Sequence, residues 1–344
     1  MKKKCVAIGI ILMFIGTCLI PTPAVKTEQS SQPTPRENWL YVGGSGPGNY
    51  TKIQDAIDNA TDGDTVYVYD DSSPYYENIM ITSSIHLLGE NTQTTIINGT
   101  TNDTFMNLTL NIGVYITANK VTLQGFTIRG CNFTGIGINS NNNSITDNIL
   151  EDNYNGIGIG YVGINQTSPQ LNNDNLIRNN VFIRDTGGIY VADGKNNIIE
   201  ENVFFQNGNS IAVVMSMNTN ISHNVISEGA NGVLTLGSYN TILFKNNITN
   251  NENIGVYTVL TSADKILQNN FIGNNKSAVS FQIFLLRILL FKKEVDFPIR
   301  RNVWNGNYWD GPRTLPYKIP GWCRVKFQID WHPAQEPYDI SGMS

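Results

Sequence analysis

Residues 180–226, NVFIRDTGGIYVADGKNNIIEENVFFQNGNSIAVVMSMNTNISHNVI, contain the start of one short unit three times over. Each start is an Asn followed by two apolar residues, at Asn180, Asn202 and Asn224, and the starts are 22 residues apart. Related starts occur at Asn148, Asn247 and Asn270, so the steps along the series are 32, 22, 22, 23 and 23 residues. A fixed period of this length indicates a solenoid built from stacked repeats.

A second marker keeps the same phase as the first. Eight residues after each Asn, a small residue opens or lies within an apolar run, at Gly156, Gly188, Ser210, Gly232, Gly255 and Ala278. The apolar residues are Ile, Val, Phe and Leu, interrupted by Asn, Gly, Asp and Ser, which is typical of strands and turns. We therefore predict an all-β protein, a single right-handed parallel β-helix with three-strand coils over residues 38–302. An insertion around residues 161–173 accounts for the one long step.

The repeated Asn has a structural role in such a coil. Asn tolerates the left-handed backbone conformation of a tight turn, and stacked Asn side chains can form a hydrogen-bonded ladder. We therefore expect Asn202 to have a positive φ and to bond to the coils on both sides. The pairs Asn246-Asn247 and Asn269-Asn270 each allow a shift of the ladder by one residue.

The two ends of the chain differ in composition from the repeats. Residues 1–24 have three lysines before an apolar stretch, which predicts a signal peptide and a secreted or cell-surface protein. An uncleaved signal anchor is the alternative, and it would be the only contact with a membrane. Residues 25–37 are predicted to be a disordered spacer. Residues 303–344 are rich in Pro and Trp and are predicted to form an irregular cap at the carboxy-terminal end.

A short helix is predicted over residues 50–60. Ile53, Ala56 and Ile57 recur at helical spacing, and Thr51 with Gln54 matches a capping box. Strand-like sequence follows directly from residue 63. We expect the apolar side of the helix to cover the open amino-terminal end of the solenoid, which would otherwise expose strand edges.

Several segments match the pattern of a known group of proteins. They are residues 50–57 (YTKIQDAI), 63–68 (GDTVYV), 75–79 (YYENI), 85–90 (IHLLGE), 95–99 (TIING) and 302–310 (NVWNGNYWD). With the Asn-anchored repeats, they resemble the NosD-like and pectin-lyase-like right-handed parallel β-helix proteins secreted by archaea and bacteria. The resemblance implies the fold but not an activity, because this architecture hosts lyases, hydrolases, epimerases, adhesins and accessory proteins.

Catalysis on this fold would need carboxylates that converge on one groove. The sequence lacks the motifs of polygalacturonase-like hydrolases, and its acidic residues occupy different phases of the repeat. Candidates for an acidic cluster are Asp147, Asp152, Asp174, Asp185 and Asp193, with Arg178 and Arg184 as basic groups. We therefore favour a protein that is not an enzyme, with a polysaccharide lyase or glycoside hydrolase as the alternative.

The resemblance to NosD-type proteins also implies a periplasmic copper-accessory role as a further alternative. Copper(I) prefers Met, Cys and His ligands. The best local group is Met215, Met217 and His223, with the two Met alternating along one strand. We expect these side chains to fill the core or the outer wall, and we predict no metal and no cofactor. Cys131 and Cys323 lie far apart in the repeats, so no disulfide is predicted.

A polar column along one edge of the solenoid is the predicted binding surface. Its residues follow the anchor Asn by four or five positions and include Asp152, Arg184, Asp185, Gln206, Asn207, Glu228 and Glu252. Rungs about 4.8 Å apart would nearly match the residue repeat of an extended polysaccharide. We predict a monomer that binds polysaccharide or a cell-surface protein without turnover. Nucleic acid is not expected as a partner, because only 15% of the residues are charged, whereas the phosphates of nucleic acid call for Lys/Arg patches.

Overall fold

The computed structural model describes residues 38–99, 111–160, 172–282, 300–321 and 327–340. These residues belong to one compact unit, Glu37–Ser344. The predicted signal peptide, the predicted spacer and most of the insertion at 161–173 lie outside the described residues.

Three long sheets form the walls of the protein. Sheet A contains, in spatial order, β1 (Trp39–Val42), β2 (Thr65–Val68), β4 (His86–Gly89), β7 (Thr122–Gln124), β10 (Ser144–Thr146), β14 (Leu176–Arg178), β18 (Ile198–Glu200), β21 (Asn220–Ser222), β24 (Ile242–Phe244), β27 (Lys265–Leu267), β30 (Val303–Asn305), β33 (Gln328–Asp330) and β32 (Tyr317–Ile319). Sheet B contains β5 (Ile96–Asn98), β8 (Thr127–Arg129), β11 (Ile149–Glu151), β15 (Val181–Ile183), β19 (Val203–Phe205), β22 (Val225–Ser227), β25 (Asn247–Thr249), β28 (Asn270–Ile272) and β31 (Tyr308–Trp309). Sheet C contains β3 (Ile79–Ile81), β6 (Ile112–Ile116), β9 (Thr134–Ile138), β12 (Asn155–Ile159), β16 (Gly187–Ala192), β20 (Asn209–Val214), β23 (Asn231–Leu236), β26 (Ile254–Val259) and β29 (Lys276–Phe281).

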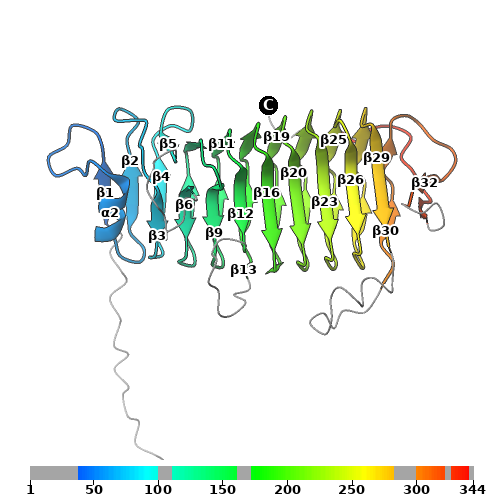
Figure 1. Ribbon diagram of the computed structural model, residues 1–344, viewed down its shortest axis with the longest axis horizontal. Coiled ribbons are helices and arrows are strands. Elements are labelled where there is room, and N and C mark those ends of the chain that lie inside the picture. Colours follow the sequence, from blue (N-terminus) through cyan, green and yellow to red (C-terminus); the bar gives the residue numbers. More distant parts are fainter. Residues whose placement is uncertain (1–37, 100–110, 161–171, 283–299, 322–326, 341–344) are drawn as a thin grey trace, which may run out of the picture. The chain divides into compact units, whose positions relative to one another are not determined.

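The chain passes through sheets A, B and C in turn, and each complete passage through the three sheets forms one coil. A representative coil runs from β18 through β19 to β20, and each of these strands pairs in parallel with the equivalent strand of the next coil. The strands of sheet C lie side by side in sequence order (Figure 1). A small sheet of β13 (Asn172–Asn173) and β17 (Gly194–Lys195) lies between sheets C and A along the coil. The predicted parallel β-helix is confirmed. Its coils continue beyond residue 302, because β30 and β31 pair in parallel with β27 and β28.

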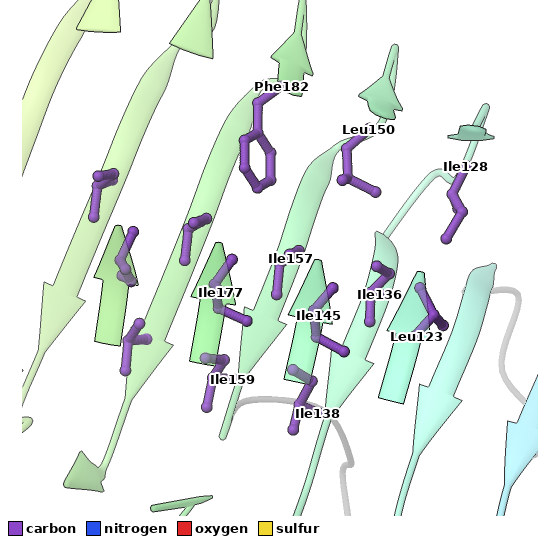
Figure 2. Close-up of a cluster of buried hydrophobic side chains, with 14 of the residues drawn as sticks. Leu123, Ile128, Ile136, Ile138, Ile145, Leu150, Ile157, Ile159, Ile177 and Phe182 are labelled. Carbon is purple, nitrogen blue, oxygen red and sulfur yellow. The ribbon is translucent and has the colours of Figure 1, made fainter. Parts of the chain in front are cut away.

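The core is a set of apolar columns that run along the stack. Leu123, Ile145 and Ile177 of sheet A occupy equivalent positions in successive coils and are fully buried. Figure 2 shows these side chains directed toward those of sheets B and C, including Phe182. The Phe182 ring stacks on the ring of Phe204 in the next coil at a centroid distance of 4.6 Å. Each coil therefore buries its apolar side chains against its two neighbours, as expected for a solenoid.

The corners of the coil use the left-handed conformation, but not at the repeated Asn. Glu201, before Asn202, has a φ of 57°, and Gln206, before Asn207, has the same value. At the corner between sheets A and B, this position is held by Asp147, Asn179, Glu201, His223, Lys245 and Gln268. The prediction that Asn202 itself has a positive φ is therefore wrong. The corner needs two functions, a left-handed bend and a ladder amide, and consecutive residues supply them.

The Asn ladder at the corner between sheets A and B, here the AB ladder, runs through Asn148, Asn180, Asn202, Asn224, Asn246, Asn269 and Asn307. Each member before Asn307 donates its backbone N–H, and its Nδ2 as well, to Oδ1 of the next Asn; for Asn202 and Asn224 both distances are 3.0 Å. The last two predicted anchors, Asn247 and Asn270, are one residue out of register. They are the first residues of β25 and β28, and the true ladder members precede them.

The amino-terminal helix, α2, spans Ile53–Asn59 and buries Ile53, Ala56 and Ile57 against the solenoid core. Its first turn has no side-chain cap from within the helix, so the predicted capping box of Thr51 and Gln54 is wrong. Glu77 takes that role, because its carboxylate accepts the backbone N–H groups of Ile53 and Gln54 at 2.8 and 3.0 Å. A carboxylate at a helix amino terminus also interacts favourably with the helix dipole.

Candidate functional site

The predicted polar column divides into two rows with opposite exposure. One row is a second buried ladder at the corner between sheets B and C, here the BC ladder: Asn153, Asp185, Asn207, Gly229, Asn251 and Asn274. Asp185 and Asn207 are each only 1% exposed. The expectation that these two side chains lie on the surface is wrong, since both point into the coil and bond to backbone groups of adjacent coils.

The other row is exposed and consists of the left-handed corner residues Asp152, Arg184, Gln206 and Glu228. These side chains contact each other. Arg184 donates to both carboxylate oxygens of Asp152 at 2.9 and 2.8 Å, and Gln206 donates to Glu228 at 3.4 Å. The hydrogen bonds from Arg184 lower the pKa of Asp152. Glu252 is exposed but lies outside this row, because it aligns with Ala230 two positions further along the turn.

The structure does not bring together the acidic and basic residues considered for catalysis. Asp147 lies at the AB corner and Asp152 at the BC corner, whereas Asp174 and Asp193 lie at the two corners between sheets C and A. Both arginines are engaged in ion pairs: Arg178 contacts Glu201 at 2.7 Å, and Arg184 contacts Asp152 at 2.8 Å. Asp185 is buried in the BC ladder.

The soft ligands considered for copper are also dispersed. Met215 is the left-handed residue that follows β20, Met217 forms an isolated bridge, and His223 lies at the AB corner beyond β21. The sequence analysis had placed Met215 and Met217 alternately along one strand, and the structure shows that this prediction is wrong. Within the described parts of the chain, no three His, Cys, Asp or Glu side chains are grouped so that they could hold a metal ion. Met215, Met217 and His223 therefore do not fit a copper site.

Cys131 offers no accessible thiol. Its side chain is 1% exposed, and its sulfur fills the space that a Cβ on Gly99 or Gly113 would need. Burial raises the pKa of the Cys131 thiol to about 12. The thiolate is the form that binds metals and reacts, so this residue behaves as a small core side chain.

A group of aromatic rings on β1, on β2 and on the residue directly after β2 forms a surface that the sequence interpretation missed. Trp39, Tyr41, Tyr67 and Tyr69, here the aromatic patch, lie on the outer face at the amino-terminal end of sheet A. Val42, Val66 and Val68 point inward from the same strands and are fully buried. Alternation along both strands therefore directs the rings to the outside.

The rings of the aromatic patch contact each other but do not bury each other from solvent. Trp39 lies 6.2 Å from Tyr41 and 6.1 Å from Tyr67, and Tyr67 lies 5.1 Å from Tyr69 edge to face. Trp39 nevertheless remains 51% exposed and Tyr41 remains 38% exposed. An exposed aromatic surface next to polar groups is typical of a binding site.

Carboxylates lie beside the aromatic patch. Asp70 directly follows Tyr69, and its backbone N–H donates to Glu90 at 3.0 Å. Burial raises the pKa of the Tyr67 hydroxyl, and the negative charges of Glu90 and Asp70 raise it further. Both carboxylates are therefore close enough to influence a ligand on the rings. The sequence signal for the patch was the alternation in Trp39-Leu40-Tyr41 and Tyr67-Val68-Tyr69, separated by 25 residues along the chain.

Comparison with protein families identifies residues 48–314 with the model described as "Periplasmic copper-binding protein (NosD)". This range covers most of the chain. The protein belongs to the NosD family. A search of curated protein sequences gave no significant match.

Several solved structures have similar folds at low sequence identity. The complex of XylC with xylose matches with a TM-score of 0.51 at 14% identity, covering 81% of this chain and 53% of that chain. This NosD-family chain therefore spans about half the length of XylC. A lacto-N-biosidase of Eubacterium ramulus matches with a TM-score of 0.48 at 11% identity, covering 87% of this chain and 67% of that chain. Carrot pectin methylesterase matches with a TM-score of 0.39 at 11% identity, covering 78% and 83%. These similarities concern the fold alone.

The one helix among the described residues, α2, is too short to cross a membrane.

Proposed function

We propose that this NosD-family protein binds glycans outside the cytoplasm, and that the aromatic patch is the binding surface. The observation that carries the proposal is the set of four contacting rings on adjacent strands, of which Trp39 and Tyr41 are exposed. The rings are held by a β-sheet whose inner face is fully packed. A ligand would therefore meet a surface that is already ordered, which reduces the entropy lost on binding.

The chemistry of the patch suits sugar rings. The axial C–H groups of a pyranose form an apolar face that can stack on Trp or Tyr, while its hydroxyls need hydrogen-bond partners at the rim. The phenolic hydroxyls of Tyr41 and Tyr67 and the carboxylates of Asp70 and Glu90 can supply these partners. Rings from β1 and β2 are spaced by one rung, about 4.8 Å. More than one sugar unit of a chain could therefore be engaged.

The neighbouring charges favour a neutral polysaccharide over a polyuronate. Asp70 and Glu90 lie beside the patch, and the protein has a formal net charge of −5. Like charges brought together on binding reduce affinity and select against anionic partners. The complex of XylC with a neutral sugar has a related fold, and this supports only the suitability of the architecture.

The family description supports an extracytoplasmic location, as does the predicted signal peptide. The proposal is binding without turnover, since the candidate acids lie at different corners of the coil. The exposed row of Asp152, Arg184, Gln206 and Glu228 is less suited to binding the ligand. Its side chains would first have to exchange their present partners for the ligand.

Affinity electrophoresis in gels that contain xylan, a neutral β-glucan or polygalacturonate tests the proposal. Trp39→Ala should weaken retardation by the neutral polysaccharides at least about tenfold, as for a central aromatic contact. Trp331→Ala is the matched control, because Trp331 is 62% exposed but lies in the carboxy-terminal region. Equal retardation of both variants and the unmodified protein would reject the aromatic patch as the site.

The charge selectivity is tested separately with Glu90→Gln. Gln removes the negative charge but keeps the ability to hydrogen-bond sugar hydroxyls. Glu90→Gln should therefore increase retardation by polygalacturonate much more than it changes retardation by neutral polysaccharides. Strong binding of polygalacturonate by the unmodified protein would contradict the neutral specificity but not the site. Release of reducing sugars or unsaturated products from any of these polysaccharides would instead establish an enzyme.

A further inference from the structure

A carboxylic acid occupies a position in the BC ladder at which the neighbouring coils have an amide. Asp185 lies between Asn153 and Asn207, and its Oδ1 accepts the backbone N–H of Asn153 at 2.8 Å. Its own backbone N–H donates to Oδ1 of Asn207 at 2.9 Å. Oδ1 of Asp185 therefore does what the amide oxygen of Asn does elsewhere in the ladder.

The second oxygen of Asp185 stands where an amide nitrogen would be. In the adjacent coils this nitrogen donates to a carbonyl of the preceding coil: Asn153 Nδ2 to Ile128 at 3.1 Å, and Asn207 Nδ2 to Phe182 at 3.0 Å. By the strand register, the equivalent carbonyl for Asp185 is that of Leu150. Oδ2 of Asp185 is buried and has no hydrogen-bond partner. A carboxylate oxygen can only accept, whereas this position in the ladder calls for a donor.

The structure assigns a proton-binding site to Asp185: its carboxyl group is neutral in the folded protein and donates through Oδ2, as the Asn amides do. A buried unpaired carboxylate would be far less stable than a buried carboxylic acid with one donor and one acceptor. A proton thus completes a ladder that an ionised side chain would interrupt.

The charged groups around Asp185 support the neutral form. Glu151 and Asp152 lie in the preceding coil. Arg184, which directly precedes Asp185 in the chain, is bound to these two carboxylates. Arg129, one coil earlier, is paired with Glu151, and Cys131 is buried and uncharged. The next coil contributes the neutral side chains Gln206 and Asn207. Burial is the main cause that raises the pKa of Asp185 to about 8; the hydrogen bonds from Asn153 oppose the rise, and the negative charges of Asp152 and Glu151 contribute to it.

The sign of the resulting pH dependence follows from proton linkage. The unfolded chain releases this proton near pH 4, whereas the folded chain holds it until about pH 8. Between these values the folded state binds more protons, so the contribution of Asp185 to stability falls as pH rises. The contribution is complete below pH 4 and is lost above about pH 8. An alkaline environment should therefore loosen the solenoid near this coil.

Asp185→Asn provides an isosteric test, because it installs the residue that the ladder has in the adjacent coils. Melting temperatures should be measured from pH 5 to pH 9 for the unmodified protein, Asp185→Asn and Asp174→Asn. Asp174 is an exposed corner residue whose neighbour in the next coil is Asn196, so it controls for loss of one surface charge. The melting temperature of the unmodified protein and of Asp174→Asn should fall by several degrees more over this range than that of Asp185→Asn.

Infrared spectroscopy provides a readout that does not depend on stability. At pH 6 the unmodified protein should show the carbonyl stretching band of a protonated carboxylic acid, and Asp185→Asn should lack it. This band should vanish on titration to pH 9. Absence of the band at pH 6, or parallel pH profiles of melting for the unmodified protein and Asp185→Asn, would overturn the assignment.

Discussion

The AB and BC ladders occupy equivalent corners of the same coils but differ in composition. Every AB position from residue 148 to residue 307 is Asn, and the series ends on the carboxylate of Asp330, which accepts Nδ2 of Asn307 at 3.0 Å. The BC ladder contains Asp185 and Gly229 among its amides. The AB corner therefore keeps an unbroken series of side-chain hydrogen bonds, whereas the BC corner accommodates an acid and a missing side chain within the same stack.

The largest effect is expected in the AB ladder, for Asn202→Val. The side chain of Asn202 accepts from the backbone and Nδ2 of Asn180 and donates to Asn224 and to the carbonyl of Ile177. Its loss leaves buried groups of both neighbouring coils unpaired, so unfolding should become easier by about 3–5 kcal/mol. Thermal melting followed by circular dichroism measures the loss. A change under about 1 kcal/mol would show that the AB ladder does not hold the stack together.

An intermediate effect is expected in the BC ladder, for Asn207→Val. Asn207 accepts the backbone N–H of Asp185 and donates to Phe182, which is fewer side-chain bonds than Asn202 makes. We expect a loss of about 1.5–3 kcal/mol, because the site is buried. The sequence analysis had placed Asn207 in an exposed polar column, where the same substitution would have almost no effect on stability. A loss as large as that of Asn202→Val under identical conditions would remove the distinction between the two ladders.

A smaller effect is expected where the BC ladder lacks a side chain. A Cβ at Gly229 would collide with the backbone carbonyl of Asn207, so Gly229→Ala requires a local backbone shift. Overpacking of this kind should cost about 1–2 kcal/mol. Gly311→Ala is the control, because a Cβ there meets nothing within 4 Å. Chemical denaturation of both variants gives the comparison, and a stabilised Gly229→Ala would mean that the gap is a packing defect.

The smallest effect is expected on the exposed row next to the BC ladder. Gln206→Ala removes one long contact of 3.4 Å to Glu228 at the surface. The free energy of unfolding should change by less than about 0.5 kcal/mol. Chemical denaturation beside Asn207→Val separates the two adjacent residues directly. A loss above 1 kcal/mol would show that the exposed row contributes to the corner itself.

The sequence located some features well because they depend on local pattern. The period of 22 or 23 residues required short strands, and β18, β19 and β20 have this arrangement. The apolar spacing of Ile53, Ala56 and Ile57 located α2. The sequence did not show which residue at each corner bends the chain and which one belongs to the ladder. Left-handed positions accept residues as different as Glu201, His223 and Lys245, so residue type alone did not distinguish the bend from the ladder.

The candidate sites depended on contacts that the sequence does not display. The aromatic patch exists because β1 and β2 pair in register, which brings Tyr41 beside Tyr67 across 26 residues of chain. The cap of α2 by Glu77 has the same origin, since the carboxylate arrives from beyond β2.

The sequence by itself therefore determined the solenoid, its period and the helix at its amino-terminal side, because periodic burial of apolar residues leaves few other folds. Only the tertiary structure decided which face each polar residue occupies. Gln206 and Asn207 are adjacent in the chain, yet one is exposed and the other is 1% exposed. The physical reason is that a single left-handed residue turns the chain at the corner, so consecutive side chains there point to water and to the neighbouring coil.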